Sequence, residues 1–196
     1  MSKTSGRWAI ATVSALALAL LTLEADPWPW LFSQIHSHLS SPIDAAAPEV
    51  RGCPANAKPA NLNFALKDLS NTEVKLSAFK GKVILLDFWA TWCGPCKIEI
   101  PWFIEFQNKY GKNGLQVIGI SVDDTLDKLK PFVGQAKMNY VVLQGLDHED
   151  VQDAYGPMFG FPTTIIISRD GKACFRHVGL ASKDAFESQI KALLAL

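Results

Sequence analysis

The chain has 196 residues, of which 48% are hydrophobic, with 19 basic and 19 acidic side chains and four cysteines. This length suits one domain with an appendage, and the hydrophobic content excludes a disordered chain. Zero net charge argues against a nucleic-acid-binding protein, and four cysteines are too few for a disulfide-stapled mini-protein but enough for a redox pair, a metal site or two bridges.

The N-terminus has the pattern of an export signal. Lys3 and Arg7 precede an uncharged run over residues 8–23, an arrangement that keeps the basic end inside while the run enters the membrane. The run is slightly short for a transmembrane helix, which needs about 18 to 20 apolar residues. However, Leu23 interrupts the small-residue pattern of a cleavage site, and two tryptophans follow where interfacial aromatic side chains would lie. We therefore expect an uncleaved signal anchor over residues 1–25, with a cleaved signal peptide and a secreted protein as the alternative.

A linker and then a single domain follow the anchor. Residues 26–59 are rich in Ser, Pro and Ala with little periodicity, which is typical of a linker. Residues 60–196 form the domain, in which the charges of the two signs balance. The domain therefore has no overall field to steer a charged partner.

Strands and helices alternate along the domain, which predicts a mixed sheet with helices on both faces. Gly111 is expected to stop the helix that precedes it. In chain order the expected elements are strands over 61–69 and 71–76, a turn over 77–81, a strand over 83–89, a helix over 96–110, a strand over 115–121, a helix over 124–136, a strand over 139–143, a helix over 147–155, a hairpin of strands over 163–167 and 173–178, and a final helix capped by Ser182.

The strongest chemical signal is Trp92-Cys93-Gly94-Pro95-Cys96, which follows the central strand and opens a helix. A helix N-terminus presents free N–H groups and about half a positive charge, so a thiolate there is stabilised and its pKa falls. We expect Cys93 to be the exposed nucleophile and Cys96 to be the more buried resolving thiol. A zinc site would need a second close cysteine pair, which Cys53 and Cys174 do not form. We therefore expect no metal and no other cofactor.

The segment from Phe88 to Cys96 resembles the strand–helix junction of the thioredoxin superfamily, in particular its membrane-tethered TlpA/ResA-like branch. Residues 76–83, Glu99 and Pro101 match that branch as well. The resemblance covers about residues 60–196. It implies an α/β thioredoxin fold, with a mixed central sheet flanked by helices, an N-terminal strand extension and a central helix–strand insertion at about 124–143.

The resemblance also implies a substrate-binding surface. Phe161-Pro162 matches the family's cis-proline, which packs against the catalytic pair and presents the backbone of Phe161 to an extended substrate segment. Trp92, Gly94 and Pro95, beside the nucleophile, complete the expected substrate-binding residues.

Two carboxylates are candidates for proton transfer. Asp87 lies within an apolar strand, and burial would raise its pKa, which suits a base that deprotonates Cys96; the alternative is a solvent-facing residue. Glu99 follows Cys96 by three residues on the same side of the helix; the alternative is a Glu that only favours the helix dipole. Asp87 matches the buried aspartate of thioredoxins and Glu99 the acid of the ResA-like proteins, so either could handle the proton.

Cys53 and Cys174 are candidates for a structural disulfide. In an exported protein they could pair and pin the linker to the edge of the sheet. The alternative is two independent thiols, with Cys174 buried as a small hydrophobic side chain.

The resemblance implies an extracytoplasmic thiol-disulfide oxidoreductase that reduces protein disulfides, with apocytochrome c as a client class. Because the chain has no nicotinamide or flavin motif, a membrane electron donor of the DsbD/CcdA type is implied too. We expect a monomer, anchored in the membrane by its N-terminal helix, with the domain facing the periplasm or the cell exterior. The alternatives are a peroxiredoxin-like peroxidase, because residues 75–82 look similar in that family, and a copper-binding chaperone, which would need a histidine such as His148 near both thiols.

Overall fold

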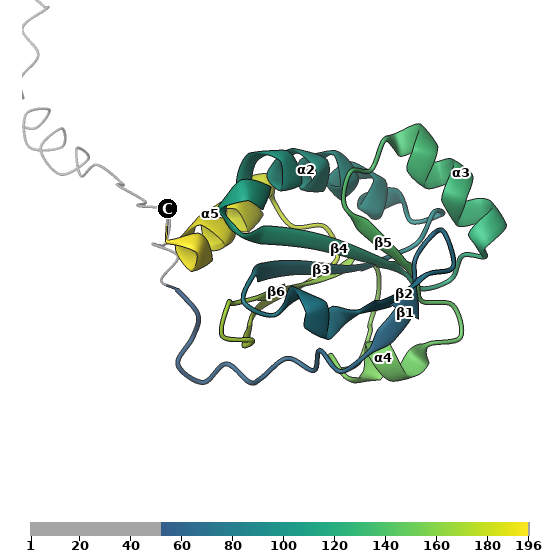
Figure 1. Ribbon diagram of the computed structural model, residues 1–196. Helices are drawn as coiled ribbons and strands as arrows, with labels where there is room; N and C mark the ends of the chain where they lie inside the picture. The colour runs from purple at the N-terminus through teal and green to yellow at the C-terminus, as the bar shows by residue number, and fades with distance from the viewer. Residues whose placement is uncertain (1–51, 196) are drawn as a thin grey trace, which may run out of the picture. The chain divides into compact units, whose positions relative to one another are not determined.

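The computed structural model of the protein describes residues 52–195 (Figure 1). The signal anchor expected over 1–25, and the linker as far as residue 51, lie outside the described residues. Within residues 52–195, no helix combines the length and the apolar character needed to cross a membrane.

A five-stranded mixed sheet in the order β5-β4-β3-β6-β7 forms the centre of the domain. β3 (Val83–Trp89), β4 (Leu115–Ser121) and β5 (Val141–Gln144) run parallel, and β6 (Thr163–Ile167) and β7 (Ala173–Val178) are antiparallel to their neighbours. Every residue of β3 is buried, as predicted for a strand that is apolar on both faces except for Asp87.

Helices cover both faces of the sheet, as the alternation of elements predicted (Figure 1). On one face, the β3 residues Val83 and Leu85 pack against aromatic side chains of α2 (Gly94–Tyr110) and α5 (Lys183–Leu194). On the other face, Ile84 and Leu86 of β3 pack with Val151 of the short α4 (Glu149–Asp153). Alternate β3 side chains therefore serve two separate cores.

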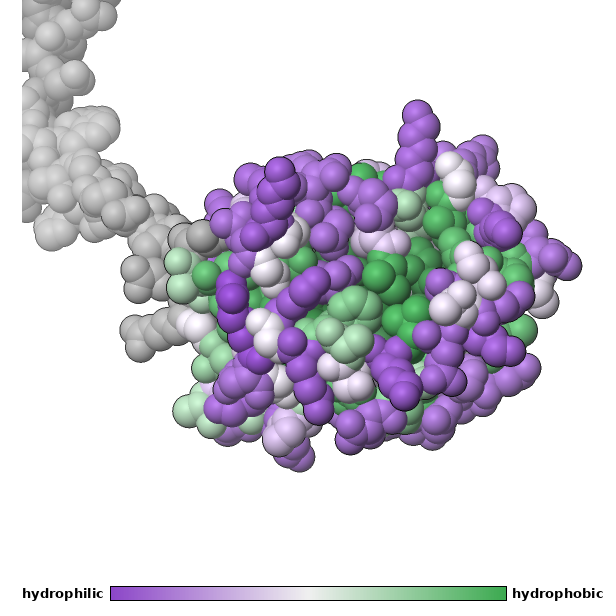
Figure 2. Space-filling model, in the orientation of Figure 1, coloured by the Kyte–Doolittle hydropathy of each residue, from purple (hydrophilic) through white to green (hydrophobic). Residues whose placement is uncertain are grey.

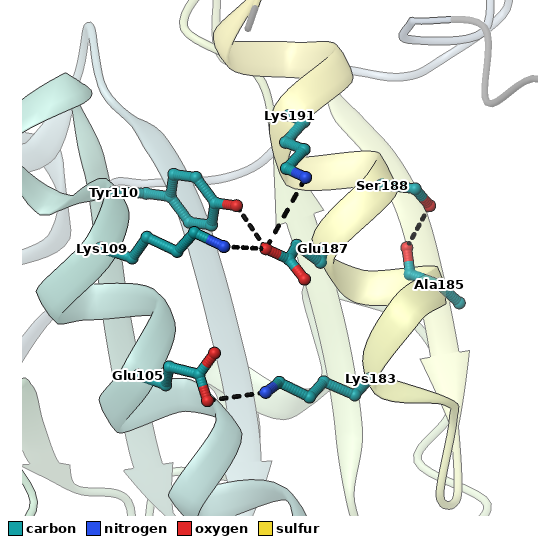
Figure 3. Close-up of polar contacts among 8 residues, drawn as sticks. All are labelled: Glu105, Lys109, Tyr110, Lys183, Ala185, Glu187, Ser188 and Lys191. Carbon is teal, nitrogen blue, oxygen red and sulfur yellow. Dashed lines mark hydrogen bonds and ion pairs between the residues drawn. The ribbon is translucent and has the colours of Figure 1, made fainter.

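Polar contacts join α2 to α5 across the outer surface of the helix pair (Figure 3). Lys109 and Tyr110, at the end of α2, both donate to one oxygen of Glu187 on α5. One to two turns earlier on α2, Glu105 pairs with Lys183 at 2.6 Å. These contacts hold the C-terminal half of α2, so that its N-terminal half has a fixed place over the sheet.

The N-terminal strand extension covers the edge of the sheet at β5. It is a hairpin of β1 (Ala65–Lys67) and β2 (Glu73–Lys75), and Asp68 after β1 bridges to Leu143 of β5. Hydrophilic side chains cover most of the face in Figure 2, and apolar surface shows between them over β5 and this hairpin. A protected edge strand is less open to pairing with other chains.

The end of the expected linker lies against the domain. The Ala173 N–H of β7 donates to the carbonyl of Lys58 at 2.9 Å, and the Ala60 N–H donates to the carbonyl of Gly171 at 2.8 Å. A disulfide also joins Cys53 to Cys174. Residues 53–59, which the sequence assigned to the linker, therefore run beside the start of β7.

Two local predictions differ from the structure. The turn expected over 77–81 is a 3-10 helix over Leu76–Phe79. Gly111 does not take the left-handed conformation of a helix stop, since its φ is −56°; the chain continues into a 3-10 turn over Gly111–Asn113 and Gly114 adopts a φ of 103°. Tightening into 3-10 geometry satisfies the last carbonyls before the chain turns away.

The insertion contains α3 (Leu126–Ala136) and β5, as the resemblance implied. α3, β5 and α4 each begin about two residues later than the sequence pattern predicted. For α3 the reason is clear, because Thr125 has an extended backbone and Asp124 turns inward to bind another loop instead of opening the helix.

Candidate active site

The cysteine pair lies where β3 ends and α2 begins. Cys93 is the N-cap residue of α2, and its sulfur accepts a hydrogen bond from the Cys96 N–H at 3.2 Å. The first turn of α2 has no acidic side chain to offset the positive end of the helix. A thiolate on Cys93 would therefore be stabilised by a free backbone N–H and by the helix dipole.

The structure holds Cys93 and Cys96 as a disulfide, and both are buried. Cys93 is 3% exposed and Cys96 is 1% exposed, so Cys96 is the more buried of the two, but the expectation that Cys93 is exposed is wrong for this disulfide form. The reason is that Cys93 packs into a cluster with Trp89, Ile100 and the partly buried Phe161. The neighbouring Gly94 and Pro95 are exposed and leave an approach from outside.

A second element of the site is the Phe161–Pro162 peptide bond, which is cis. The Pro162 carbonyl accepts a hydrogen bond from the Gly179 N–H at 2.7 Å, and the Thr163 hydroxyl donates to the Gly160 carbonyl at 2.7 Å. The Phe161 ring meets the Trp92 ring edge-on, with centroids 6.4 Å apart. Tertiary packing thus brings the two expected halves of the substrate surface together.

Asp87 is buried on the face of the sheet that α2 covers, so it is not the solvent-facing residue of the alternative reading. It is 1% exposed, and Thr164 of β6 donates to it at 3.1 Å. Burial raises the pKa of Asp87 well above its ordinary value, and the nearby charge of Glu99 raises it further.

Glu99 is also buried, on the side of α2 that faces the sheet. One carboxylate oxygen, Oε1, accepts a hydrogen bond from the Ala181 N–H at 3.1 Å. Burial raises the pKa of Glu99 to about 7, although this hydrogen bond lowers it in part. The structure therefore brings the two candidate acids close enough for their charges to interact, and Glu99 lies within one helical turn of Cys96.

The loop before Cys93 is held by two aspartates that the sequence analysis did not single out. Asp124, 2% exposed, accepts hydrogen bonds from the backbone N–H and the hydroxyl of Thr91 and from the Ser121 hydroxyl. Asp123 accepts from the indole N–H of Trp92 at 2.9 Å. The ends of neighbouring parallel strands meet at one edge of a sheet, so two acids directly after β4 were a usable signal for contact with the loop after β3.

Several exposed apolar side chains lie on the segments that carry the site residues. The large hydrophobic residues that stand exposed within residues 52–195 are Trp92, Ile98, Phe159, Val178 and Leu180. Trp92 precedes the nucleophile, and Phe159 lies in the loop before the cis-proline. Val178 and Leu180 flank Gly179, whose N–H donates to the Pro162 carbonyl. Leu180 precedes Ala181, whose N–H donates to Glu99, and Ile98 is the residue before Glu99 on α2. We call these five residues the apolar rim.

The remaining candidates lie elsewhere. His148 pairs with Asp150 at 3.6 Å and lines a hollow with Glu73 and Gln144, apart from the thiols. Among the residues described here, no group of three or more His, Cys, Asp or Glu side chains could hold a metal ion. Within residues 52–195, His148 therefore does not stand beside the cysteines as the copper-chaperone alternative requires.

Comparisons with known proteins agree with this geometry. A family model described as the AhpC/TSA family matches residues 58–174. The chain is 34% identical to a thiol-disulfide oxidoreductase ResA of Bacillus thuringiensis subsp. konkukian (strain 97-27), over 67% of this chain and 75% of that protein. It is 33% identical to the ResA of Bacillus subtilis (strain 168), over 56% of this chain and 60% of that one.

Among solved structures, the chain resembles a putative thiol:disulfide interchange protein DsbE from Chlorobium tepidum. The identity is 35%, the TM-score is 0.64, and the match covers 71% of this chain and 99% of that one. A second interchange protein, from Chlorobium tepidum TLS, gives 27% identity and a TM-score of 0.65, with 72% and 99% of the two chains covered.

Proposed function

The chain belongs to the AhpC/TSA family and is a ResA-like thiol-disulfide oxidoreductase of the thioredoxin superfamily, and we propose that it reduces disulfides in exported proteins. The direction of the reaction, reduction of the client, is inferred from the burial of Asp87 and Glu99 near the cysteine pair. A strongly oxidising pair is one whose reduced form is stabilised. Two buried acids add no positive charge to the site, and once ionised they repel a thiolate. This repulsion opposes the stabilisation of the Cys93 thiolate by the helix dipole. It therefore favours the donation of electrons by the reduced cysteine pair.

The reaction has two displacement steps. The Cys93 thiolate attacks one sulfur of a client disulfide, which forms a mixed disulfide and releases the other client sulfur as a thiolate. Cys96 then loses its proton and attacks the Cys93 sulfur, so the Cys93–Cys96 disulfide forms and the second client thiolate leaves. Two electrons pass to the client, and the released thiolates take up protons.

The buried acids handle the proton of Cys96. We assign this role to Asp87 and Glu99 together, because their charges interact and such a pair titrates as a unit. Glu99, with a pKa of about 7, is the member that changes charge near neutral pH. A base with a pKa near the working pH is the most effective proton acceptor.

The apolar rim contacts the client. A client disulfide must reach Cys93 between Trp92 and the loop that carries Phe161, and the rim side chains around that point expose large apolar surface. Contiguous exposed apolar patches of this kind mark protein interaction sites. We therefore infer that clients present an extended segment with apolar residues next to the cysteine, and that the backbone of Phe161 pairs with that segment.

The location and the partners are inferred from the sequence. The basic residues and apolar run before residue 25 support export with membrane anchoring, and the domain would face the periplasm or the cell exterior. A reductant there needs a source of electrons, which supports a membrane donor of the DsbD/CcdA type. Apocytochrome c is the client class that the resemblance favours, and the protein would work as a monomer.

Reduction of insulin by the full-length protein, with dithiothreitol as the electron source, tests this function. We expect insulin to precipitate faster than with dithiothreitol alone, and Cys93→Ala to abolish the acceleration. The double variant Cys53→Ser/Cys174→Ser is the matched control and should retain the activity. The proposal is wrong if Cys93→Ala remains as active as the unaltered protein, or if the protein consumes peroxide but leaves insulin oxidised.

A further inference from the structure

Three buried side-chain atoms have no hydrogen-bond partner within residues 52–195: the Trp89 indole Nε1, the Tyr140 hydroxyl and the Glu99 Oε2. Two of them are donors and the third is an acceptor. Buried polar groups without partners are rare, and each costs free energy unless something satisfies it. Their chemistry is complementary, which makes their relative position important.

Trp89 and Tyr140 meet around Gly119 of β4 on the α2 face of the sheet, and Glu99 is buried on α2, which covers this face. Gly119 stands opposite Asp87 in the parallel register of β3 and β4. A Cβ atom at position 119 would lie 2.8 Å from the Trp89 Nε1 and 3.3 Å from the Tyr140 ring. The absence of a side chain at Gly119 therefore lets the indole N–H and the phenol ring lie against the sheet beside Asp87.

The charges of Asp87 and Glu99 both act on Tyr140. Burial raises the pKa of the Tyr140 hydroxyl well above its ordinary value, and the charges of Asp87 and Glu99 both add to the rise. Tyr140 belongs to the inserted segment, just before β5, and packs into the clusters that contain α2 residues on this face.

Within the described residues, no Lys, Arg or His charge is among the groups that shift the pKa of Asp87, Glu99 or Tyr140. α3 contributes the apolar side chains Leu129, Phe132, Val133 and Ala136 to the cluster around the cysteines. β6 contributes the Thr164 hydroxyl, and the segment before α5 contributes the Ala181 N–H. His177 of β7, paired in register with Thr164, has its ring bonded to Gln189. The other titratable groups at this end of the described domain are Cys93 and Cys96, Asp123 and Asp124 after β4, and the exposed Lys97 of α2, whose Nζ lies 5.9 Å from the centroid of the Phe132 ring.

From this arrangement we propose that Tyr140 is a positioning residue for proton transfer, whose hydroxyl, together with the Trp89 indole N–H, hydrogen-bonds the free oxygen of Glu99 when that carboxylate is ionised. The proposal rests on the oxidoreductase function proposed above and extends it to the inserted segment. The two donors stabilise this buried anion. They thereby set the pH at which Glu99 becomes able to accept the proton of Cys96.

The test is Tyr140→Phe in the reduced full-length protein, which removes the hydroxyl and keeps the ring. The ionisation of Glu99 is followed by the ¹³C shift of its carboxyl group, a readout that does not depend on activity. We expect the midpoint of Glu99 to rise by about one pH unit, since hydrogen bonds to the charged form favour that form. Tyr155→Phe is the matched control, because the Tyr155 hydroxyl bonds the Asn61 carbonyl and its ring packs in the core on the opposite face; it should leave the midpoint unchanged.

Thermal unfolding gives a second readout. If the hydroxyl serves the ionised carboxylate, Tyr140→Phe lowers the melting temperature more at pH 8 than at pH 5. An unchanged Glu99 midpoint would overturn the proposal, and so would a melting temperature that rises equally at both pH values, which is the result for a hydroxyl that has no partner. If the unaltered protein does not reduce insulin, the proposed function is wrong. The ¹³C titration of Glu99 can still be measured in that case, so the two failures are distinguishable.

Discussion

Asp124 binds Thr91 at two points: one carboxylate oxygen accepts the Thr91 backbone N–H at 2.7 Å, and the other accepts the Thr91 hydroxyl. The same carboxylate accepts the Ser121 hydroxyl at 2.7 Å. It therefore joins the ends of the parallel strands β3 and β4 two residues before Cys93. This contact across the sheet fixes the loop that leads to Cys93.

Replacing Asp124 should disturb both stability and catalysis. In Asp124→Ala the Thr91 N–H and the Ser121 hydroxyl would lose their acceptor, and we expect a loss of roughly 2–4 kcal/mol in urea unfolding. Because the loop also sets the position of Cys93, insulin reduction should slow as well. Asp127→Ala, an exposed acid in the first turn of α3, is the control. Equal effects of the two substitutions would show that the buried contact has no special role.

Glu99 predicts a pH-dependent stability. Its pKa rises from 4.5 in the unfolded chain to about 7 in the folded protein, so the folded state holds a proton that the unfolded state has lost. Stability should therefore fall as the pH rises from about 4.5 through 7. In Glu99→Gln the pH-dependent part of the stability that comes from Glu99 disappears, while the side chain keeps an oxygen that can accept the Ala181 N–H.

The variant Glu99→Gln should thus be more stable than the unaltered protein at pH 8, by roughly 2 kcal/mol, and little different at pH 4.5. Urea unfolding at the two pH values measures this. Insulin reduction by the variant should be slower at pH 8, where the unaltered protein has an ionised Glu99. A stability difference that does not change with pH would contradict the shifted ionisation of Glu99.

The Cys53–Cys174 disulfide closes a loop across a sequence separation of 121 residues. In the chain-entropy account, a loop of this size stabilises the folded state by about 4–5 kcal/mol. We expect Cys53→Ser/Cys174→Ser to lose stability on this scale while it retains insulin reduction, because the bond lies at β7 and away from Cys93. A variant with unchanged denaturation midpoint would show that the bond does not form in the purified protein.

Glu187 links α2 and α5 through Lys109 and Tyr110 (Figure 3). The hydrogen bonds from Lys109 and Tyr110 lower the pKa of Glu187 to about 2, so its contribution to stability is present above about pH 4.5 and is lost as the pH falls through 2. Because the group is near the surface, Glu187→Gln should cost less than about 1 kcal/mol at pH 7. The difference from the unaltered protein should vanish near pH 2, as measured by thermal unfolding; a difference that persists there would show that the contact is not ionic.

The sequence alone predicted the parts of the site that depend on local structure. The cysteine pair, its place between a buried strand and a helix, and the strands over 83–89 and 115–121 follow from apolar periodicity and from the helix N-terminus, both of which act over a few residues. It also predicted the mixed sheet, because alternation of strands and helices leaves few topologies.

Only the tertiary structure decided how distant side chains meet. Asp124 and Thr91 are 33 residues apart, and Glu99 and Ala181 are 82 apart; such contacts depend on strand order and on register, which no local pattern contains. The same holds for Tyr140, whose sequence context is that of an ordinary strand entry. Local residues therefore determined where the cysteine pair lies, while the packing of α2 on the sheet determined which buried groups lie around it.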